Sequence, residues 1–386
     1  MTTLPQAIPP RSGPKGHLRN FWMRVSDGMA VSQLWSQAVR DARSSYRFYS
    51  AGLEDVQPGR SRWRRWWQIA KALFWAILEK LTPARRILLL LGLVLLIAPA
   101  NEKFDSHIWG GLVILIVLLL ELADRVIMKR DLEIAKDIQA WLLPGAPLQI
   151  PGYKLAYATR PANTVAGDYY DVILRPGNAS QGSSGASSNV SSGSDGRVLF
   201  VVADVAGKSI PAAMLMATFQ ASLRTLSTSG IALTDLVTGA NRYACSNSQG
   251  GVRFTTAFFA ELDLATGEIV YLNAGHNAPI LRKKTGVAER LDTGGIPIGI
   301  FAESTYQVGK TRLESGDWLV IFTDGVVEAV DQKDEEYGET ALMRIVNREP
   351  ESSPAELLRS LFGDLDRYVG NTPQQDDITC LLLKRT

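Results

Sequence analysis

The stretch Val198–Lys208, with the sequence VLFVVADVAGK, joins an uninterrupted apolar run to an aspartate and then to a glycine. A short apolar run that is rich in valine is typical of a buried strand. Asp204 follows this run directly, so its carboxylate is expected at the end of a core strand, where it can point into an open site. The stretch predicts a buried strand that delivers an acidic side chain to one edge of the fold.

Short apolar runs of this kind recur in the C-terminal two-thirds of the chain, and helical runs lie between them. The clearest predicted strands cover 198–202, 256–262, 268–272 and 318–322, and the predicted helices cover 211–226, 233–246, 340–346 and 354–368. Groups of strands that alternate with groups of helices are typical of an α+β sandwich. Ser, Gly and Asn dominate 176–196, which predicts a disordered loop between two strands.

The first 86 residues differ from the rest of the chain in charge and in aromatic content. They hold 15 Lys and Arg against five Asp and Glu, whereas the remaining residues hold 26 against 34. Six of the nine tryptophans also lie there, interleaved with arginine at 62–67. This pattern suits an anionic lipid headgroup layer, and it also suits nucleic-acid bases. The apolar runs that follow favour lipid and disfavour nucleic acid. Residues 1–65 form a basic, Trp-rich region, and residues 1–60 within it resemble no sensor domain.

Two apolar runs, Ile87–Ala100 and Ile108–Ala123, predict a helical hairpin. Each is shorter than the roughly 20 residues of a comfortable bilayer crossing, so a tight pair of transmembrane helices, a re-entrant hairpin and a buried pair in a soluble fold all stay open. Basic residues at 85–86 and 129–130 favour the membrane, with both ends in the cytoplasm. We therefore expect membrane-associated helices over 66–124, with the hairpin at 87–123. The amphipathic stretch 66–81 could instead pack on the soluble domain.

A helical stripe continues beyond the hairpin into a linker helix, expected over 125–145. The apolar residues that step along it by three and four positions are Met128, Leu132, Ala135, Ile138 and Leu142. Such a helix could carry a signal and pair in a homodimer, or simply dock one face on the domain that follows. Pro144 and Gly145 are expected to end it.

Four acidic positions stand at a strand end or beside a glycine: Asp168, Asp204, Asp324 and the pair Asp376–Asp377. Carboxylate oxygens select hard cations such as Mg²⁺ or Mn²⁺. Only three histidines and two isolated cysteines are present, which argues against a soft-metal site. A single Asp-Gly is chiefly a turn signal, but four such positions in this order indicate more than turns.

From the linker helix to the C-terminus, about two-thirds of the chain resembles the SpoIIE-like branch of the PPM family, bacterial phosphatases that act on serine-phosphorylated regulators of sigma factors. The matching segments are EIAKDIQ (133–139), LLP (142–144), RP (160–161), AGDYYD (166–171), DVAGK (204–208), AA (212–213), FTTAF (254–258), NAGHNAP (273–279), GIPIG (295–299), TDGVVE (323–328) and QDDIT (375–379). The family's usual Gly-Gly-Asp is Ala-Gly-Asp here, and its Gly-Lys-Gly is Gly-Lys-Ser, and neither change removes an acidic residue.

The resemblance implies a PPM-type fold over 150–386, in which helices flank a central antiparallel β-sandwich. It implies that Asp168, Asp204, Asp324 and either Asp376 or Asp377 bind two divalent cations, Mn²⁺ or Mg²⁺. The backbone carbonyl of Val205 would complete the ligands, and Asp376 is the favoured member of its pair. Two such cations activate a water for direct attack on phosphorus.

The resemblance further implies a substrate, and the hairpin with its flanking basic residues indicates a location. The substrate would be a phosphoserine or phosphothreonine on a regulatory protein, such as an anti-anti-sigma STAS domain, and the location the bacterial inner membrane, with the catalytic domain in the cytoplasm. Arg160 and Lys208 are candidates for contact with phosphate, although a surface ion pair and a helix cap explain them equally well. His276 is expected to be structural. The alternatives are a catalytically weak phosphoprotein-binding module of the same fold and a nuclease or phosphodiesterase, which the acidic catalytic part disfavours.

Overall fold

The computed structural model describes most of the chain beyond residue 70. The described residues are 71, 74–75, 78–99, 105–175, 196–207, 210–247, 253–348 and 350–386. The expected basic region 1–65, most of the expected loop at 176–196 and Lys208 lie outside them. The chain divides into two compact units, residues 1–125 and 126–386.

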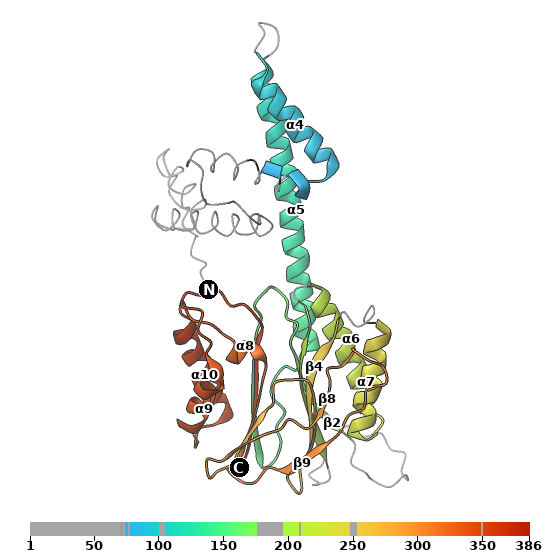
Figure 1. The fold of residues 1–386 in the computed structure, drawn as a ribbon, viewed down its shortest axis with the longest axis vertical. Helices are drawn as coiled ribbons and strands as arrows, with labels where there is room; N and C mark the ends of the chain where they lie inside the picture. Colours follow the sequence, from blue (N-terminus) through green and yellow to red (C-terminus); the bar gives the residue numbers. More distant parts are fainter. Residues whose placement is uncertain are drawn as a thin grey trace, which may run out of the picture. The chain divides into compact units, whose positions relative to one another are not determined.

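The first unit contains a helical hairpin formed by α4 (Pro83–Ile97) and the first part of α5 (Ser106–Leu142) (Figure 1). Arg85 Nη1 lies 3.1 Å from Glu121 Oε2 and 2.7 Å from Asp124 Oδ2, so one arginine joins the two helices. The backbones also approach closely, because a Cβ on Gly110 would lie only 2.8 Å from the carbonyl oxygen of Gly92. Glycine at this crossing lets the two helices touch.

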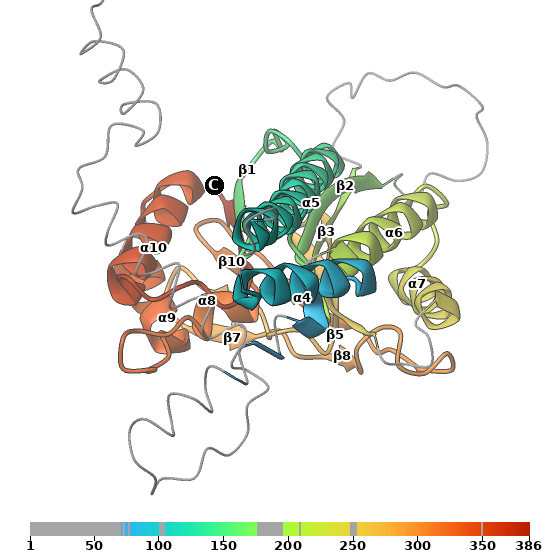
Figure 2. The same cartoon turned by 90° about the horizontal axis from the view of Figure 1, so that it is seen from above.

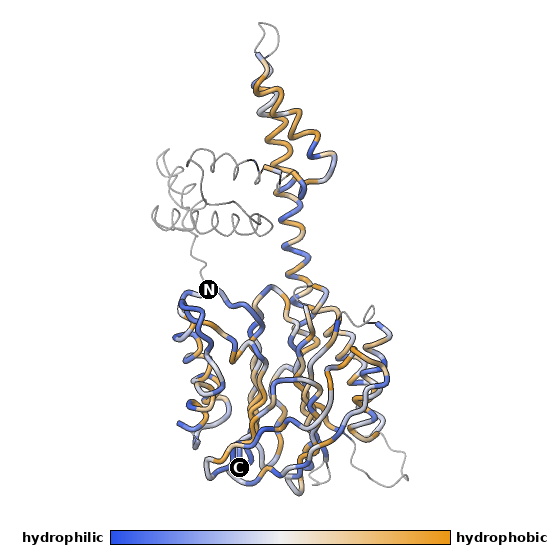
Figure 3. Tube along the Cα trace, viewed as in Figure 1, coloured by the Kyte–Doolittle hydropathy of each residue, from blue (hydrophilic) through white to orange (hydrophobic). Residues whose placement is uncertain are grey.

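The apolar side chains of the hairpin are largely exposed. The hairpin is coloured mostly orange in Figure 3. Among them, Ile97 is 82% exposed and Ile87 is 67% exposed. Even so, no helix in the described part of the chain has both the length and the apolar character that a bilayer crossing requires. The expected transmembrane helices are therefore not supported.

The linker helix is not a separate element. α5 runs without a break from the second arm of the hairpin to Leu142, because no glycine or proline interrupts residues 112–143. It ends just before Pro144, which cannot continue a helix.

The second unit is a sandwich of two sheets covered by helices on both outer faces (Figures 1 and 2). The first sheet has five antiparallel strands in the order β1 (Tyr153–Arg160), β11 (Ile378–Arg385), β10 (Trp318–Phe322), β6 (Ile280–Arg282) and β7 (Ala288–Arg290). The second sheet has six strands, β2 (Tyr169–Arg175), β3 (Arg197–Val205), β4 (Thr255–Asp263), β5 (Glu268–Ala274), the short parallel β8 (Gly294–Gly295) and β9 (Gly309–Arg312), which also pairs with β5.

Helices cover the outer face of each sheet. The second sheet is covered by α6 (Ile210–Ser227) and α7 (Leu233–Asn247), and the first by α8 (Asp324–Val327), α9 (Gly338–Arg348) and α10 (Pro354–Val369). The expected α+β sandwich flanked by helices is thus confirmed.

Burial on both faces explains why β3 is apolar at every position from Val198 to Ala203. Phe200 and Val202 enter the core between the two sheets, whereas Leu199 and Val201 enter the core beneath α6 and α7. Successive side chains of a strand point to opposite faces, so a strand that is buried on both faces loses the usual polar alternation. Asp204 is the first position at which this burial relaxes, and it lies at the sandwich edge.

Candidate functional site

The predicted acidic residues come together from strand ends at one edge of the sandwich. Asp168 directly precedes β2 and Asp204 lies at the end of β3, and these strands are neighbours because Tyr169 pairs with Ala203. Asp324 follows β10 and Asp376 precedes β11, which are also neighbours. Each sheet therefore contributes two of the four carboxylates.

A hydroxyl group links the two halves of the site. Thr323 Oγ1 donates to Asp168 Oδ2 over 2.9 Å, and it accepts from the backbone N–H of Thr379 over 3.0 Å. Thr323 is fully buried. The turn that carries Asp324 is therefore tied to the segment that carries Asp168. Gly325 packs against the carbonyl of Asp377 so closely that a Cβ would lie 2.0 Å from its oxygen.

Asp168 is a buried carboxyl beside a second one. The residue is only 1% exposed, and burial raises the pKa of its carboxyl well above the usual value. The neighbouring charges of Asp204 and Asp377 raise the pKa further, while hydrogen bonds from Thr379 and Thr323 oppose this. Two carboxylates this close are costly to ionise together unless a cation lies between them.

Backbone oxygen also faces this position. A Cβ on Gly167 would lie 3.1 Å from the carbonyl oxygen of Val205 and 3.7 Å from Asp204 Oδ1. The turn before Asp168 thus lies directly against the end of β3. This brings the carbonyl of Val205, expected as a backbone ligand, next to the segment that bears Asp168.

The two members of the C-terminal pair differ in surroundings. Asp377 is 8% exposed, and its carboxylate accepts from the N–H groups of Ala162 over 2.7 Å and Gly167 over 2.6 Å. Asp376 is half-buried, and its Oδ1 accepts from the N–H of Asp377 over 2.9 Å. The Asp377 carboxylate holds the loop before Asp168, whereas Asp376 lines a cavity at the site.

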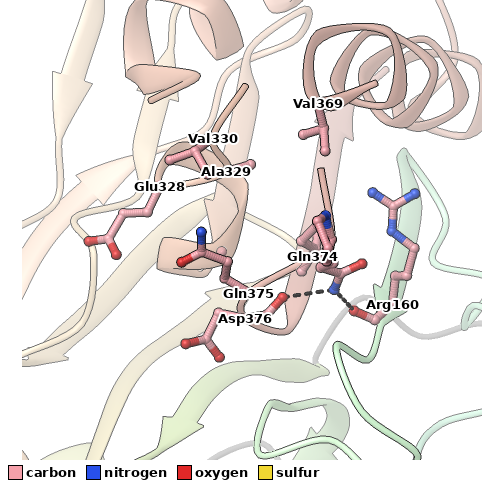
Figure 4. A pocket seen from close by; sticks show the side chains of 11 residues that line it. Arg160, Glu328, Ala329, Val330, Val369, Gln374, Gln375 and Asp376 are labelled. Atoms are coloured by element: carbon pink, nitrogen blue, oxygen red, sulfur yellow. Dashed lines mark hydrogen bonds between the residues drawn. The ribbon is translucent and has the colours of Figure 1, made fainter. Parts of the chain in front are cut away.

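This cavity, of about 110 Å³, lies beside the acidic edge (Figure 4). Its lining includes Arg160, Glu328, Gln374, Gln375 and Asp376. Burial raises the pKa of Glu328, and the charges of nearby acidic groups, including Asp324 and Asp376, add to the effect. Glu328 therefore belongs to the same negative region.

Arg160 lines the cavity, but its guanidinium contacts side chains of α10. Its Nη1 lies 2.5 Å from Asp366 Oδ1, and its guanidinium carbon lies 5.4 Å from the centre of the Phe362 ring. In Figure 4 the guanidinium extends away from the Asp376 carboxylate. The surface ion pair foreseen for this residue is thus present in the structure.

His276 is buried in a turn of polar contacts. Its Nδ1 lies 3.1 Å from Thr256 Oγ1, its backbone N–H donates to Asn273 Oδ1 over 2.7 Å, and its carbonyl accepts from Asn273 Nδ2 over 2.9 Å. Burial lowers the pKa of His276 to about 4. The imidazole is therefore neutral near pH 7, in keeping with a structural role.

In the described residues, the structure gathers no group of three or more His, Cys, Asp or Glu side chains in a way that could hold a metal ion. The donor chemistry nevertheless fits a hard cation, because the site offers carboxylates and a backbone carbonyl and no soft ligand. The closeness of Asp168 and Asp204, with the Val205 carbonyl beside them, is the arrangement that a divalent cation would stabilise.

Three positioning side chains escaped the sequence analysis. Thr323 and Gln139 each belonged to a segment that matches the family, TDGVVE and EIAKDIQ, but neither residue was given a role. Arg224 of α6 donates to both carboxylate oxygens of Asp171 over 2.8 and 2.9 Å, so Asp171 anchors β2 to that helix. The partners of each are far away in sequence, and no local pattern marks them.

Comparison with known proteins agrees with this geometry. The family model of Stage II sporulation protein E (SpoIIE) matches residues 194–386, half of the chain. Phosphoserine phosphatase RsbU of Bacillus subtilis is 26% identical over 260 residues, which cover 67% of this chain and 71% of that protein. Protein IcfG of Synechocystis is 25% identical over 282 residues, or 66% of this chain, and the match spans only 41% of that relative.

Among solved structures, the SiaA-PP2C domain of Pseudomonas aeruginosa superposes with a TM-score of 0.55 at 18% identity, covering 68% of this chain and 98% of that domain. At this identity the likeness concerns the fold, which is of the PP2C type. The motifs, the sandwich and the family model agree, and the chain belongs to the SpoIIE family of PPM-type phosphatases.

Proposed function

We propose that this protein is a metal-dependent serine/threonine protein phosphatase that hydrolyses phosphoserine or phosphothreonine on a regulatory protein. The observation that carries the proposal is the buried Asp168 carboxyl beside Asp204, tied by Thr323 to the turn that bears Asp324. The family membership and the name of RsbU, a phosphoserine phosphatase, support the reaction type.

The residues that would hold two divalent cations, Mn²⁺ or Mg²⁺, are Asp168, Asp204, Asp324 and Asp376, with the carbonyl of Val205. Such cations, when bound, lower the pKa of a shared water and neutralise charge on the phosphoryl group. The protein's own contribution is positioning. Thr323 and Asp377 hold the segments that bear the carboxylates, and the cavity beside Asp376 leaves room for a substrate side chain.

Arg160 is proposed as the cation that meets the substrate phosphate. Its ion pair with Asp366 is partly exposed, at 34% and 59% of the two side chains, and such pairs contribute little to stability, about 0–1 kcal/mol. A phosphate dianion could therefore displace Asp366. Lys208, the second candidate, remains a proposal from the sequence.

The proposed substrate is a phosphorylated regulatory domain of the anti-anti-sigma type, by resemblance to the family. We also propose attachment of the α4–α5 hairpin to the cytoplasmic face of a bacterial inner membrane and dimerisation through the linker part of α5. The exposed apolar side chains of the hairpin support the first, and those of Ile134 and Trp141, 48% and 82% exposed, support the second. Flotation with anionic vesicles would test membrane attachment, and light scattering would test dimerisation.

The reaction is tested with p-nitrophenyl phosphate and a phosphoserine peptide, with and without Mn²⁺. The parent protein should hydrolyse both only when Mn²⁺ is present, and Asp324→Asn should remove the activity. Asp331→Asn is the control, since Asp331 caps an exposed turn through Lys333 and Glu335. A parent that binds the phosphopeptide but does not hydrolyse it would instead be a binding module.

A further inference from the structure

The last turn of α5 carries a buried glutamine that faces the candidate site. Gln139 is only 7% exposed, whereas Ile138 and Trp141, on either side of it, are 48% and 82% exposed. Burial of an uncharged polar side chain is costly unless its hydrogen bonds are satisfied. The side-chain amide of Gln139 is therefore expected to have hydrogen-bond partners nearby.

Both ends of that amide bind one residue. Gln139 Nε2 donates to the carbonyl of Ala166 over 2.7 Å, and Gln139 Oε1 accepts from the N–H of Ala166 over 2.9 Å. Ala166 is itself 1% exposed. The side chain thus takes both backbone hydrogen bonds of Ala166, as a neighbouring strand would, and fixes this peptide to the helix.

Ala166 lies two residues before Asp168. The next residue, Gly167, donates its N–H to Asp377 Oδ2 over 2.6 Å and lies against the carbonyl of Val205. The approach to Asp168 is therefore held on one side by Asp377, from the start of β11, and on the other by Gln139, from the helix.

The helix end is anchored separately from this contact. Gln220 of α6 donates to the carbonyl of Leu142, and Leu143 packs against both cores that meet the second sheet. Gln220 is 4% exposed. Hence α5 has two buried glutamine contacts at the same end, and only that of Gln139 touches the segment that bears an acidic residue of the site.

We propose that Gln139 is a positioning residue for the metal site, which sets the affinity for divalent cations by holding Ala166 and therefore Asp168 in place. This rests on the proposed function, because it supposes that Asp168 binds a cation. A turn or slide of the end of α5 would withdraw both hydrogen bonds together, which gives the helix a direct mechanical connection to the metal site.

The test compares Gln139→Met and Gln139→Glu with the matched control Gln220→Met in the full chain. Met keeps the length of the side chain and removes its hydrogen bonds, while Glu retains an acceptor for the Ala166 N–H but places a carboxylate against the Ala166 carbonyl. Mn²⁺ binding is measured without substrate from the electron paramagnetic resonance signal of free Mn²⁺. Urea unfolding and the Mn²⁺ dependence of p-nitrophenyl phosphate hydrolysis are measured in parallel.

Gln139→Met should weaken Mn²⁺ binding about tenfold, which corresponds to part of the stabilisation that its two lost hydrogen bonds provide. At saturating Mn²⁺ its kcat should stay within about twofold of the parent value. Gln139→Glu should weaken binding at least as much, because its carboxylate repels the buried Ala166 carbonyl, and it decides the matter if the Met variant does not fold. Gln220→Met should leave Mn²⁺ binding unchanged even though it lowers stability.

Unchanged Mn²⁺ binding in the Gln139 variants would overturn the inference. So would equal weakening in the Gln139 and Gln220 variants, which would show a structural role common to both contacts. A parent protein that neither binds Mn²⁺ nor hydrolyses phosphate esters would overturn the proposed function, and with it this inference. The parent's behaviour thus separates the two failures.

Discussion

Thr323 and Asp168 are 155 residues apart in sequence and belong to segments of different sheets, yet the Thr323 hydroxyl donates a 2.9 Å hydrogen bond to the Asp168 carboxylate. The same hydroxyl accepts from the N–H of Thr379. One fully buried side chain thus aligns the two halves of the candidate site. The consequences for stability and activity can be measured.

Thr323→Val should lower the free energy of unfolding by about 1–3 kcal/mol, because it leaves the Asp168 carboxyl and the Thr379 N–H each short of a buried partner. Urea unfolding without metal measures the change. The control is Thr159→Val, which removes a hydroxyl that accepts from Thr379 Oγ1 and leaves the hydrogen bond from Thr323 to Asp168 intact. Because only Thr323 holds the Asp168 carboxylate in this pair of variants, Thr323→Val should also bind Mn²⁺ more weakly than Thr159→Val. Equal Mn²⁺ affinities would contradict the role given to Thr323 in the site.

The neighbouring residues Asp376 and Asp377 should respond differently to the same substitution. Asp376→Asn should reduce phosphatase activity by more than about 100-fold, beyond the range typical of residues that merely support a metal ligand, with little change in stability. Asp377→Asn should lower the free energy of unfolding by about 1.5–3 kcal/mol, because its carboxylate accepts from two backbone N–H groups. Steady-state kinetics and urea unfolding of both variants check the assignment, and the reverse pattern would exchange the two roles.

Arg160 and Asp366 should have opposite effects on substrate binding. If Arg160 meets phosphate, Arg160→Ala should raise KM for a phosphopeptide several-fold, and Asp366→Asn should lower it by releasing the guanidinium from its 2.5 Å ion pair. Mn²⁺ affinity should not change in either variant, since neither residue belongs to the proposed ligands. A KM that is the same in all three proteins would leave Arg160 as a surface ion pair.

His276 should make the protein less stable in mild acid. Burial lowers its pKa from 6.5 to about 4, so the unfolded chain takes up a proton that the folded protein refuses between these values. The stabilisation is complete above pH 6.5 and is lost as the pH falls towards 4, by about 3 kcal/mol. The free energy of unfolding, measured with urea from pH 7 to pH 4, should fall more steeply for the parent protein than for His276→Gln. Parallel curves for the two proteins would show that His276 does not contribute to the loss of stability in acid.

Substitution of two adjacent glycines of the helical hairpin, Gly110 and Gly111, should have different effects on its packing. Gly110→Ala places a Cβ 2.8 Å from the carbonyl oxygen of Gly92 and should separate α4 from α5, whereas nothing lies within 4 Å of a Cβ on Gly111. Gly111→Ala should therefore be neutral or stabilising by up to about 1 kcal/mol. Amide hydrogen exchange in residues 84–97 should rise only in the Gly110 variant, and equal exchange in both would mean that the crossing tolerates a methyl group.

The sequence alone could identify the segments that carry the site, because the apolar run that leads to Asp204 in β3 is a local pattern. The Asp324-Gly325 pair is likewise a local turn signal, but only the structure shows that a residue without a side chain is needed there to fit against Asp377. It could not identify Thr323 as the link between the sheets or Asp366 as the partner of Arg160, since those contacts depend on how distant elements pack. The change from apolar to mixed residues predicted a boundary between the second hairpin arm, ending by residue 124, and a linker helix from residue 125, whereas the structure shows one continuous helix.

The four acidic residues stand in two pairs, one on each sheet, and the space between the sheets is filled by side chains such as Phe258 and Leu381. The gap between the pairs is therefore set by how closely one sheet lies on the other. Mg²⁺ requires a nearly ideal octahedral arrangement of oxygen atoms at about 2.0–2.1 Å. Removing a methylene group from a side chain in the middle of the sandwich is thus expected to alter which cation the protein binds. The preference between cations would then depend on the packing of apolar side chains between the two sheets.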